Sequence, residues 1–222
     1  MSVKVVVGKD ILAANKKKAS ELKARFGEMG IKVVNMLSSP GAGKTSVLEA
    51  TIPRLRAVRA AVIEGDVATT RDAERLSHLG IPLVQITTLG ACHLDSSMIW
   101  QALGEMDLSG VDLLFIENVG NLVCPASFDL GENLRLVVLS VAEGTDKPAK
   151  YPAAFLSSQV VLINKMDLVP YTDFDLGRVL GEIRTMRPDA KVFTMSCRSG
   201  EGIDEWAGWL EKWVKGGAPL AC

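Results

Sequence analysis

The sequence KVVNMLSSPGAGKT, residues 32–45, joins an apolar run to a loop of small residues that ends at Lys44 and Thr45. Apolar residues then recur at helical spacing, at Val47, Leu48 and Ile52. A strand, a glycine loop and a helix in this order are typical of a phosphate-binding loop, whose N–H groups and helix start attract phosphate oxygens. Ser38 replaces the usual first glycine, and the strand exit tolerates this small residue. We expect six consecutive residues to contact the phosphates: Gly41, Ala42, Gly43, Lys44, Thr45 and Ser46.

Short apolar runs alternate with helical stretches along most of the chain. The predicted strands are 32–37, 60–64, 83–87, 112–117, 134–142, 160–164 and 191–196, and the clearest helices between them are 72–79, 94–106, 173–187 and 203–214. Several strands are apolar almost throughout, which is typical of parallel strands covered by helices on both faces. This order predicts an α/β fold, a doubly wound and mostly parallel sheet, with ligands at the carboxyl ends of its strands.

An amphipathic helix is predicted before the first strand. Its apolar face is assigned to Ile11, Leu12, Leu22, Phe26 and Met29. We therefore expect a helical extension at residues 1–30, one nucleotide-binding domain at residues 31–215 and a loose tail at residues 216–222.

The bulk composition is that of an ordinary globular protein. Of 222 residues, 48% are apolar and 23% charged, and the formal net charge is −1. This balance gives no global attraction to nucleic acid or to an anionic membrane, and the run Lys16-Lys17-Lys18 is interpreted as a solvated helix face. No apolar run is long enough to span a bilayer, and the amino terminus lacks a secretory signal, so we expect a cytoplasmic protein. Four cysteines at wide, unequal spacings do not indicate a disulfide framework.

Two segments favour guanine over adenine. Asn164-Lys165-Met166-Asp167 follows a predicted strand and fits the N-K-x-D element of GTPases. Its carboxylate can accept hydrogen bonds from guanine N1–H and the exocyclic amine, a pair of donors that adenine lacks. Ser196 and Cys197, at the end of the last strand, are predicted to contact the base through a backbone N–H. GTP and GDP are the expected nucleotides.

The predicted γ-phosphate sensor is Glu117-Asn118-Val119-Gly120, where GTPases commonly carry D-x-x-G. Asp66 and Asp72 are further candidates for Mg²⁺, and Asp72 is equally a candidate cap for the helix that follows it. The predicted magnesium ligands are therefore Thr45, Asp66, Asp72 and Glu117, and the predicted catalytic residues are Lys44, Asp66, Glu117 and Gly120. No glutamine stands beside Gly120 and no arginine is identifiable as a finger in cis, so slow intrinsic hydrolysis is expected.

Cys92, His93 and Cys124 form a candidate metal site. Thiolate and imidazole ligands suit Zn²⁺ or Ni²⁺, and three protein ligands are too few for a closed structural zinc site. A second copy across a two-fold axis could supply the remaining ligands. The alternative is that the cysteines act as small apolar residues. Cys222 is assigned to the tail, and His78 to the surface of a helix.

Together these motifs closely resemble the HypB family of hydrogenase nickel-incorporation GTPases, from about residue 31 to residue 214. The residues that carry the resemblance are the phosphate loop, Glu64-Gly65-Asp66, Asp72–Arg75, Cys92–Asp95, Phe115–Pro125 and Asn164–Asp167. The resemblance implies a SIMIBI-type GTPase that dimerises with GTP bound and delivers nickel to the large-subunit precursor of [NiFe]-hydrogenase. It also implies that Cys92, His93 and Cys124 bind Ni²⁺ or Zn²⁺ at the dimer interface, and that the nickel chaperone HypA is a partner. Some family members carry an amino-terminal Cys-x-x-Cys-Gly-Cys motif or a histidine-rich stretch, and residues 1–36 here hold no cysteine or histidine.

Three other classes of protein fit the sequence less well. Urease-type accessory GTPases resemble the chain in fold but carry Cys-Pro-His, whereas Ala126 follows Cys124-Pro125 here. A small-molecule P-loop kinase would need no guanine element. A static zinc-binding module would leave the phosphate loop without a purpose.

Overall fold

The computed structural model describes residues 9–216, which form one parallel sheet covered on both faces by helices. Seven strands lie in the order β3-β2-β4-β1-β5-β6-β7. Their bounds are β1 Lys32–Ser38, β2 Ala60–Asp66, β3 Leu83–Thr87, β4 Leu113–Glu117, β5 Leu134–Ser140, β6 Val160–Asn164 and β7 Lys191–Thr194. All six neighbouring pairs are parallel, which confirms the predicted fold class. The central strands β1, β4, β5 and β6 are buried along almost their whole length.

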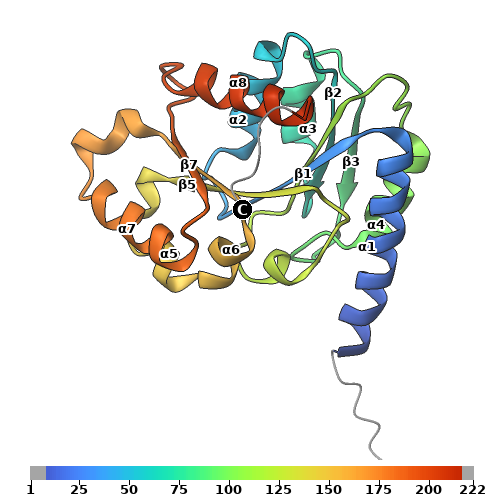
Figure 1. The fold of residues 1–222 in the computed structure, drawn as a ribbon, viewed down its shortest axis with the longest axis horizontal. Coiled ribbons are helices and arrows are strands. Elements are labelled where there is room, and N and C mark those ends of the chain that lie inside the picture. The colour runs from blue at the N-terminus through green and yellow to red at the C-terminus, as the bar shows by residue number, and fades with distance from the viewer. Residues whose placement is uncertain (1–8, 217–222) are drawn as a thin grey trace, which may run out of the picture.

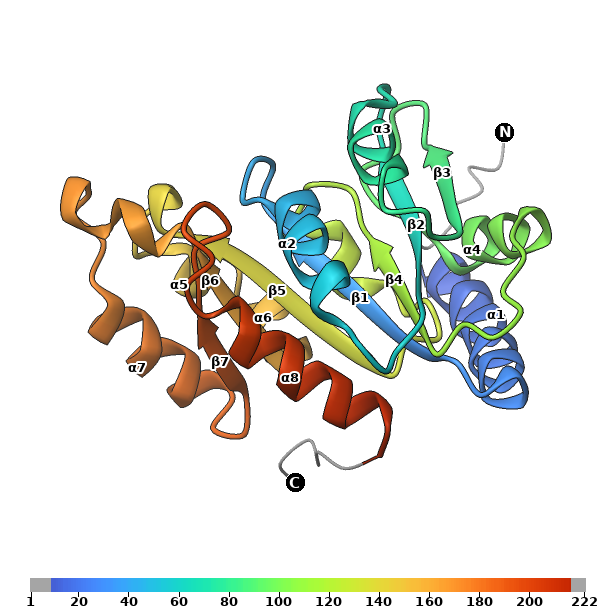
Figure 2. The same ribbon diagram turned by 90° about the horizontal axis from the view of Figure 1, so that it is seen from above.

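Three helices cover the upper face of the sheet and the others cover the lower face (Figure 1). The upper layer consists of α2 Lys44–Thr51, α3 Arg71–Ser77 and α8 Ile203–Val214. The lower layer consists of α1 Lys9–Met29, α4 Ser96–Ala102, α5 Lys147–Lys150, α6 Pro152–Ser157 and α7 Leu176–Met186. Figure 2 shows the same layers from above, with α1 and α4 at one end of the sheet and α7 at the other.

Short 3-10 turns account for two differences from the predicted boundaries, at the ends of the predicted strand 134–142 and the predicted helix 94–106. The 3-10 turns of residues 9–216 are η1 Ile52–Arg54, η2 Leu103–Glu105, η3 Cys124–Ser127, η4 Val141–Glu143 and η5 Met166–Tyr171. The predicted strand 134–142 ends at Ser140, because the Ser140 hydroxyl accepts from the Ala142 N–H and the Glu143 carboxylate accepts from the Ser140 N–H. Helix α7 begins later than predicted because Asp175 caps it by accepting from the Arg178 N–H.

The predicted apolar face of α1 is correct at two of its five residues, Leu22 and Phe26, which are buried against the sheet. Met29, in the last turn, is 41% exposed, and near the start of the helix Ile11 is 60% exposed and Leu12 is 41% exposed. Figure 1 shows the cause: the first turns of α1 extend below the body of the protein. Lys16 and Lys17 are exposed as predicted, and Lys18 lies 4.0 Å from the centre of the Trp100 ring.

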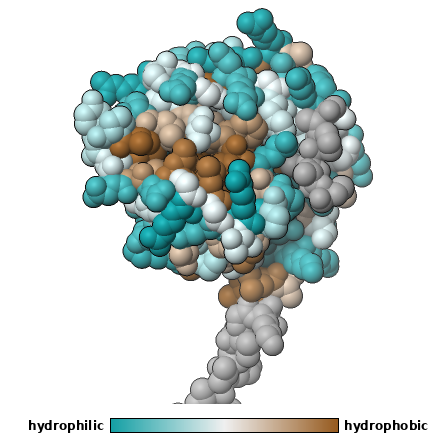
Figure 3. Space-filling model, turned by 60° about the vertical axis from the view of Figure 1, so that its left-hand side comes forward, coloured by the Kyte–Doolittle hydropathy of each residue, from teal (hydrophilic) through white to brown (hydrophobic). Residues whose placement is uncertain are grey.

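The side of the sheet at strand β7 carries an aromatic cluster in which Phe193 of β7 packs against Trp206 and Trp209 of α8. Figure 3, which brings this side of the molecule forward, shows apolar residues gathered on the surface with hydrophilic residues around them. Among residues 9–216, no helix is both long and apolar enough to cross a bilayer. Residues 1–8 and 217–222, which include Cys222 and nearly all of the predicted tail, lie outside the described residues.

Candidate functional site

The phosphate loop leaves β1 and enters α2 at the carboxyl edge of the sheet. Gly41 and Gly43 adopt positive φ angles of 76° and 101°, a conformation that glycine adopts without steric cost. A Cβ on Gly43 would lie 2.6 Å from Asn164 Nδ2, so this position also needs a glycine to let the base-binding loop approach. Lys44 is buried and its Nζ donates to Ser38 Oγ at 3.0 Å. The serine that replaces the usual glycine therefore contacts the loop's own lysine.

A cavity of 430 Å³ opens beside this loop, lined by Lys44, Thr45, Glu64, Asp72 and Glu117 among others. Thr45 Oγ1 donates to Glu117 Oε1 at 2.9 Å, and Lys44 Nζ lies 3.8 Å from the same oxygen. The cavity thus contains an ammonium group that can bind phosphate. It also contains a hydroxyl and carboxylates that can bind a divalent metal ion.

Three carboxylates converge in this cavity, and one of them was missed by the sequence analysis as a ligand. Glu64 and Glu117 are register partners on β2 and β4, and both are at least 97% buried. One oxygen each of Glu64, Asp72 and Glu117 lies within 4.8 Å of the others. The detectable signal for Glu64 was a charged residue inside an otherwise apolar strand, level with Glu117 on the neighbouring strand.

The electrostatics of this cluster fit a divalent cation. Burial, followed by the charge of Glu117, raises the pKa of Glu64 to about 11. Burial also raises the pKa of Glu117, although Lys44 opposes the change. The Oε2 atoms of both glutamates are buried without a hydrogen-bond donor among the described residues. A proton held between the two carboxyls or a cation would satisfy them, and hard oxygen ligands are those that Mg²⁺ prefers.

Asp66 and Asp72 take different positions in the cavity. Asp72 lies in the first turn of α3, whose N-cap is Thr70, so the alternative role of Asp72 as the helix cap is wrong. Asp66 lines the same cavity but lies outside the carboxylate cluster, and its Oδ1 accepts from the Ala68 and Thr69 N–H groups at 2.7 and 2.8 Å. Burial raises the pKa of Asp66, but these N–H groups outweigh it and hold the pKa below its usual value.

A second cavity of 560 Å³ continues from the first and is lined by the predicted base-binding residues. Asn164 joins the loops here: its Nδ2 donates to Ala42 O at 3.1 Å, and its Oδ1 accepts from the Cys197 N–H at 3.3 Å. Lys165 Nζ donates to Gly41 O at 2.7 Å. The Asp167 carboxylate is oriented by Ser196 Oγ, which donates to it at 2.6 Å. Asn164, Lys165, Asp167 and Cys197 all line this cavity, while Ser196 is buried behind it.

The candidate metal ligands also come together. One atom each of Cys92, His93 and Cys124 lies within 4.8 Å of the others, and Cys92 Sγ is 3.7 Å from His93 Nδ1. Cys92 is exposed, Cys124 begins η3, and the His93 ring packs on Phe128 with centroids 3.8 Å apart. The neighbouring Cys124 thiol, followed by burial, raises the pKa of Cys92. Unlike Cys92, His93 and Cys124 are half-buried. His78 is exposed elsewhere, as predicted.

The segment from Glu117 to Cys124 joins the two sites. At Gly120 it presses against the phosphate loop, since a Cβ there would lie 2.9 Å from Pro40 Cα. Asn121 bridges to Ser38 and also donates from Nδ2 to Cys92 O at 3.2 Å. One continuous segment therefore contacts the phosphate loop and both halves of the candidate metal site.

Comparison with known proteins agrees with the fold and with the family resemblance. Residues 32–194 match the family described as CobW/HypB/UreG, nucleotide-binding domain. Hydrogenase maturation factor HypB from Azotobacter vinelandii is 49% identical over 207 residues, which cover 93% of this chain and 68% of that protein. Hydrogenase/urease maturation factor HypB from Helicobacter pylori is 41% identical over 212 residues, which cover 94% and 86% of the two chains. The crystal structure of HypB from Helicobacter pylori in complex with nickel matches with a TM-score of 0.86 and 39% identity, covering 94% of this chain and 99% of that chain.

Proposed function

The chain belongs to the HypB family of hydrogenase maturation factors, within the CobW/HypB/UreG nucleotide-binding group, and we propose that it is a GTPase that couples its nucleotide state to nickel delivery. The single observation that carries the proposal is the segment from Glu117 to Cys124. Its first residue accepts a hydrogen bond from Thr45 in the phosphate loop, and its last is a candidate nickel ligand. Cys124 is seven residues from Glu117, so the chain between them spans at most about 23 Å.

In this proposal the nucleotide site binds GTP with Mg²⁺. Lys44 meets the β- and γ-phosphates, and the backbone of residues 41–46 cradles them. Thr45, Glu117, Asp72 and Glu64 are the proposed cation ligands, with Asp66 shaping the loop that follows β2. The cation would neutralise charge on the phosphates, and Gly120 would contact the γ-phosphate through its N–H. Asp167, held by Ser196, accepts from guanine and excludes adenine.

Nickel is the proposed cargo, held by Cys92, His93 and Cys124. The trio is incomplete by itself and reaches the surface at Cys92, and Leu89 and Val123 nearby in sequence are 91% and 59% exposed. We propose that a second copy of the chain covers this face when GTP is bound and contributes its own ligands, as a two-fold axis allows. Zn²⁺ suits the same donors. The proposed partners are HypA and the large-subunit precursor of [NiFe]-hydrogenase.

The compartment is part of the same proposal. Cys92 and Cys124 are unpaired thiols, the form in which they can bind a metal, and a reducing environment keeps them so. This supports a cytoplasmic location.

The experiment is light scattering and nickel analysis of the full chain with GDP and with a non-hydrolysable GTP analogue. We expect a monomer with GDP and a dimer with the analogue. We also expect nickel binding to require Cys92. Cys92→Ala should lose nickel but keep GDP, and Cys197→Ser, changed at a cysteine outside the trio, should keep nickel. Equal mass in both nucleotide states would refute the dimer, and nickel binding unaffected by Cys92→Ala would refute the site.

The target enzyme is the main alternative within the family. The Helicobacter pylori relative is named a hydrogenase/urease maturation factor, so a nickel enzyme other than hydrogenase is the second candidate. Addition of the loaded protein to apo-hydrogenase and apo-urease extracts separates the two, and we expect activation of hydrogenase.

A further inference from the structure

A buried row of polar side chains runs beneath the sheet and reaches both halves of the candidate metal site. Asn35 of β1 and Arg135 of β5 are register partners within otherwise apolar strands. Asn35 is fully buried and Arg135 is 9% exposed. Glu132 lies between them, because its Oε1 accepts from Arg135 Nε at 2.8 Å and from Asn35 Nδ2 at 3.2 Å. Such groups are expensive to bury, so each of their hydrogen bonds matters.

The first arm of this row of polar side chains runs from Asn35 through Asn118, in the predicted γ-phosphate sensor, to the residue after His93. Asn118 follows Glu117 directly and is fully buried, and its Nδ2 donates to Asn35 Oδ1 at 3.3 Å. Its Oδ1 accepts from the Leu94 N–H at 3.1 Å and from the Val119 N–H at 3.0 Å. Leu94 is the residue after His93, so this arm fixes the loop that carries Cys92 and His93.

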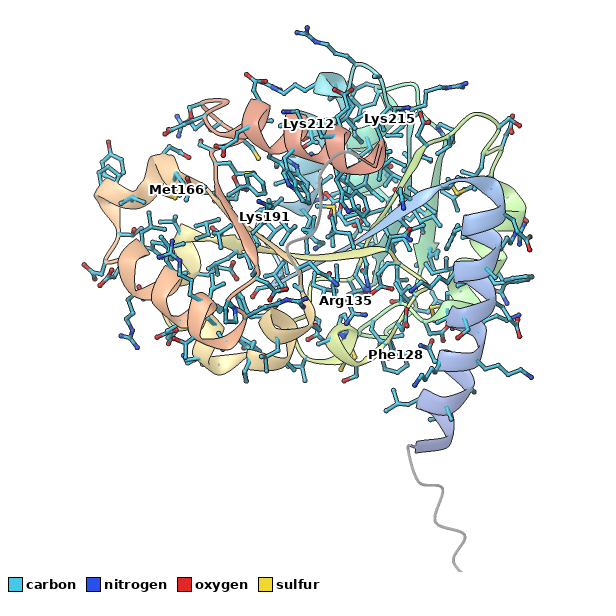
Figure 4. All side chains as sticks on the ribbon, viewed as in Figure 1. Phe128, Arg135, Met166, Lys191, Lys212 and Lys215 are labelled. Atoms are coloured by element: carbon cyan, nitrogen blue, oxygen red, sulfur yellow. The ribbon has the colours of Figure 1, made fainter. Side chains whose placement is uncertain are left out.

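The second arm reaches Cys124 and returns to His93. The Arg135 guanidinium donates from Nη1 to Ala126 O at 2.9 Å and from Nη2 to Phe128 O at 3.0 Å. It thereby caps η3, the short helix that begins at Cys124. Phe128 lies close to Arg135 on the lower side of the sheet (Figure 4). The Phe128 ring packs on His93, with ring centroids 3.8 Å apart. The two arms therefore meet at His93 and Leu94.

Asn15 of α1 bridges the same two loops from outside the sheet. Its Nδ2 donates to Asp129 O at 2.8 Å, one residue after Phe128. Its Oδ1 accepts from the Ser96 N–H and from Ser96 Oγ, each at 2.8 Å, three residues after His93. Asn15 is only 8% exposed although the start of its helix extends into solvent. Two independent sets of hydrogen bonds therefore hold the Cys92–His93 loop against the Cys124 loop.

We propose that this polar frame, made of Asn15, Asn35, Asn118, Glu132 and Arg135, consists of positioning residues that fix the two halves of the nickel site relative to each other. The inference rests on the proposed nickel site. None of the five touches the candidate ligand atoms, so they act through Leu94, Phe128 and η3. Outer residues that orient metal ligands typically change metal affinity by about 10- to 100-fold when they are replaced. The frame also passes through Asn118 and so lies one residue from the proposed cation ligand Glu117.

Two substitutions with minimal steric change test the frame. Arg135→Lys keeps the charge that balances Glu132, but an ammonium lacks the planar fork that reaches both carbonyls at once. Asn15→Asp is isosteric and places an oxygen against Asp129 O in place of the donor. The matched control is Arg187→Lys at the β7 end of the sheet, where Arg187 Nη1 similarly donates to Leu156 O at 2.9 Å.

The measurement is a competition titration of the GDP-bound full chain with Ni²⁺ against a coloured chelator, together with the sulfur-to-nickel charge-transfer absorption. We expect Arg135→Lys and Asn15→Asp to bind Ni²⁺ about tenfold or more weakly, with a shifted absorption band and unchanged GDP affinity. Arg187→Lys should match the unmodified chain. If Arg135→Lys fails to fold and to bind GDP, then Asn15→Asp, on the peripheral helix, decides alone.

Unchanged nickel affinity and an unchanged band in a variant that still binds GDP would overturn the frame while leaving the proposed function intact. Absence of nickel binding by the unmodified chain would overturn the proposed function itself. The two failures are therefore distinguishable.

Discussion

Glu64→Gln is the perturbation that probes the carboxylate cluster most sharply. In the absence of Mg²⁺ and nucleotide, the pKa of Glu64 is raised to about 11 by burial and by Glu117, against 4.5 for an exposed glutamate. Between these values the folded chain holds a proton that the unfolded chain has lost. Stability therefore falls as the pH rises above about 4.5, by at most about 1.4 kcal/mol per pH unit. The amide carries no charge, so the variant escapes this loss.

The size of the effect follows from that slope. At pH 7.5, three units above 4.5, Glu64→Gln is expected to stabilise the metal-free chain by up to about 4 kcal/mol. The difference should shrink steadily on acidification and vanish near pH 4.5. With Mg²⁺ and GTP the order reverses, because the amide cannot supply the negative charge that the cation needs.

The assay is urea unfolding at several pH values between 5 and 8.5, with and without Mg²⁺ and nucleotide. Glu205→Gln, at an exposed position on α8, is the control and should show no pH-dependent difference from the unmodified chain. A constant stability difference between Glu64→Gln and the unmodified chain across this range would refute the assignment of Glu64 to a buried, shared-proton cluster.

Three further substitutions test other parts of the structure. Asp167→Asn should weaken GDP binding by about 1.5–3 kcal/mol and favour xanthosine diphosphate, whose C2 oxygen accepts from the new amide. Isothermal titration with both nucleotides measures this, and unchanged GDP affinity would contradict the base assignment. Gly120→Ala should impair nucleotide binding with little loss of stability, since its Cβ would lie 2.9 Å from Pro40 Cα in the phosphate loop. Titration with fluorescent GDP measures this, and unchanged affinity would mean that the segment at Gly120 can move away from the phosphate loop at no cost. Thr51→Val should cost about 1–3 kcal/mol, because Trp206 Nε1 donates to Thr51 Oγ1 at 3.2 Å in the core; urea unfolding measures it, and no change in midpoint would show that this bond is dispensable.

Much of the fold could be predicted because its signals are local. The runs that became β4 and β6 are apolar up to their last residue, which is typical of strands in a sheet covered on both faces. The glycine loop and Lys44 then fix where the sheet binds its ligand. The amino-terminal helix was harder, because helical periodicity does not reveal how far a helix extends past the body; Ile11 and Leu12 follow the pattern of Leu22 but reach solvent.

The sequence predicted those parts of the candidate site that one continuous segment carries. It did not predict the residues that come together only when two strands pair. Glu64 becomes a candidate cation ligand only once β2 and β4 are in register, which places it beside Glu117. Arg135 and Asn35 are likewise 100 residues apart in sequence but opposite each other across β5 and β1. Their signal was a polar residue in a buried strand, and its partner depended on strand order, which the sequence does not specify.

The claim that nucleotide state is transmitted to the metal site has one direct test. It is the Ni²⁺ dissociation constant of the full chain, measured by chelator competition with GDP·Mg²⁺ and again with a non-hydrolysable GTP analogue and Mg²⁺. The segment from Glu117 to Cys124 contacts both sites, so we predict that the two constants differ by about fivefold or more, the lower range of allosteric coupling. Identical constants in the two nucleotide states would contradict it.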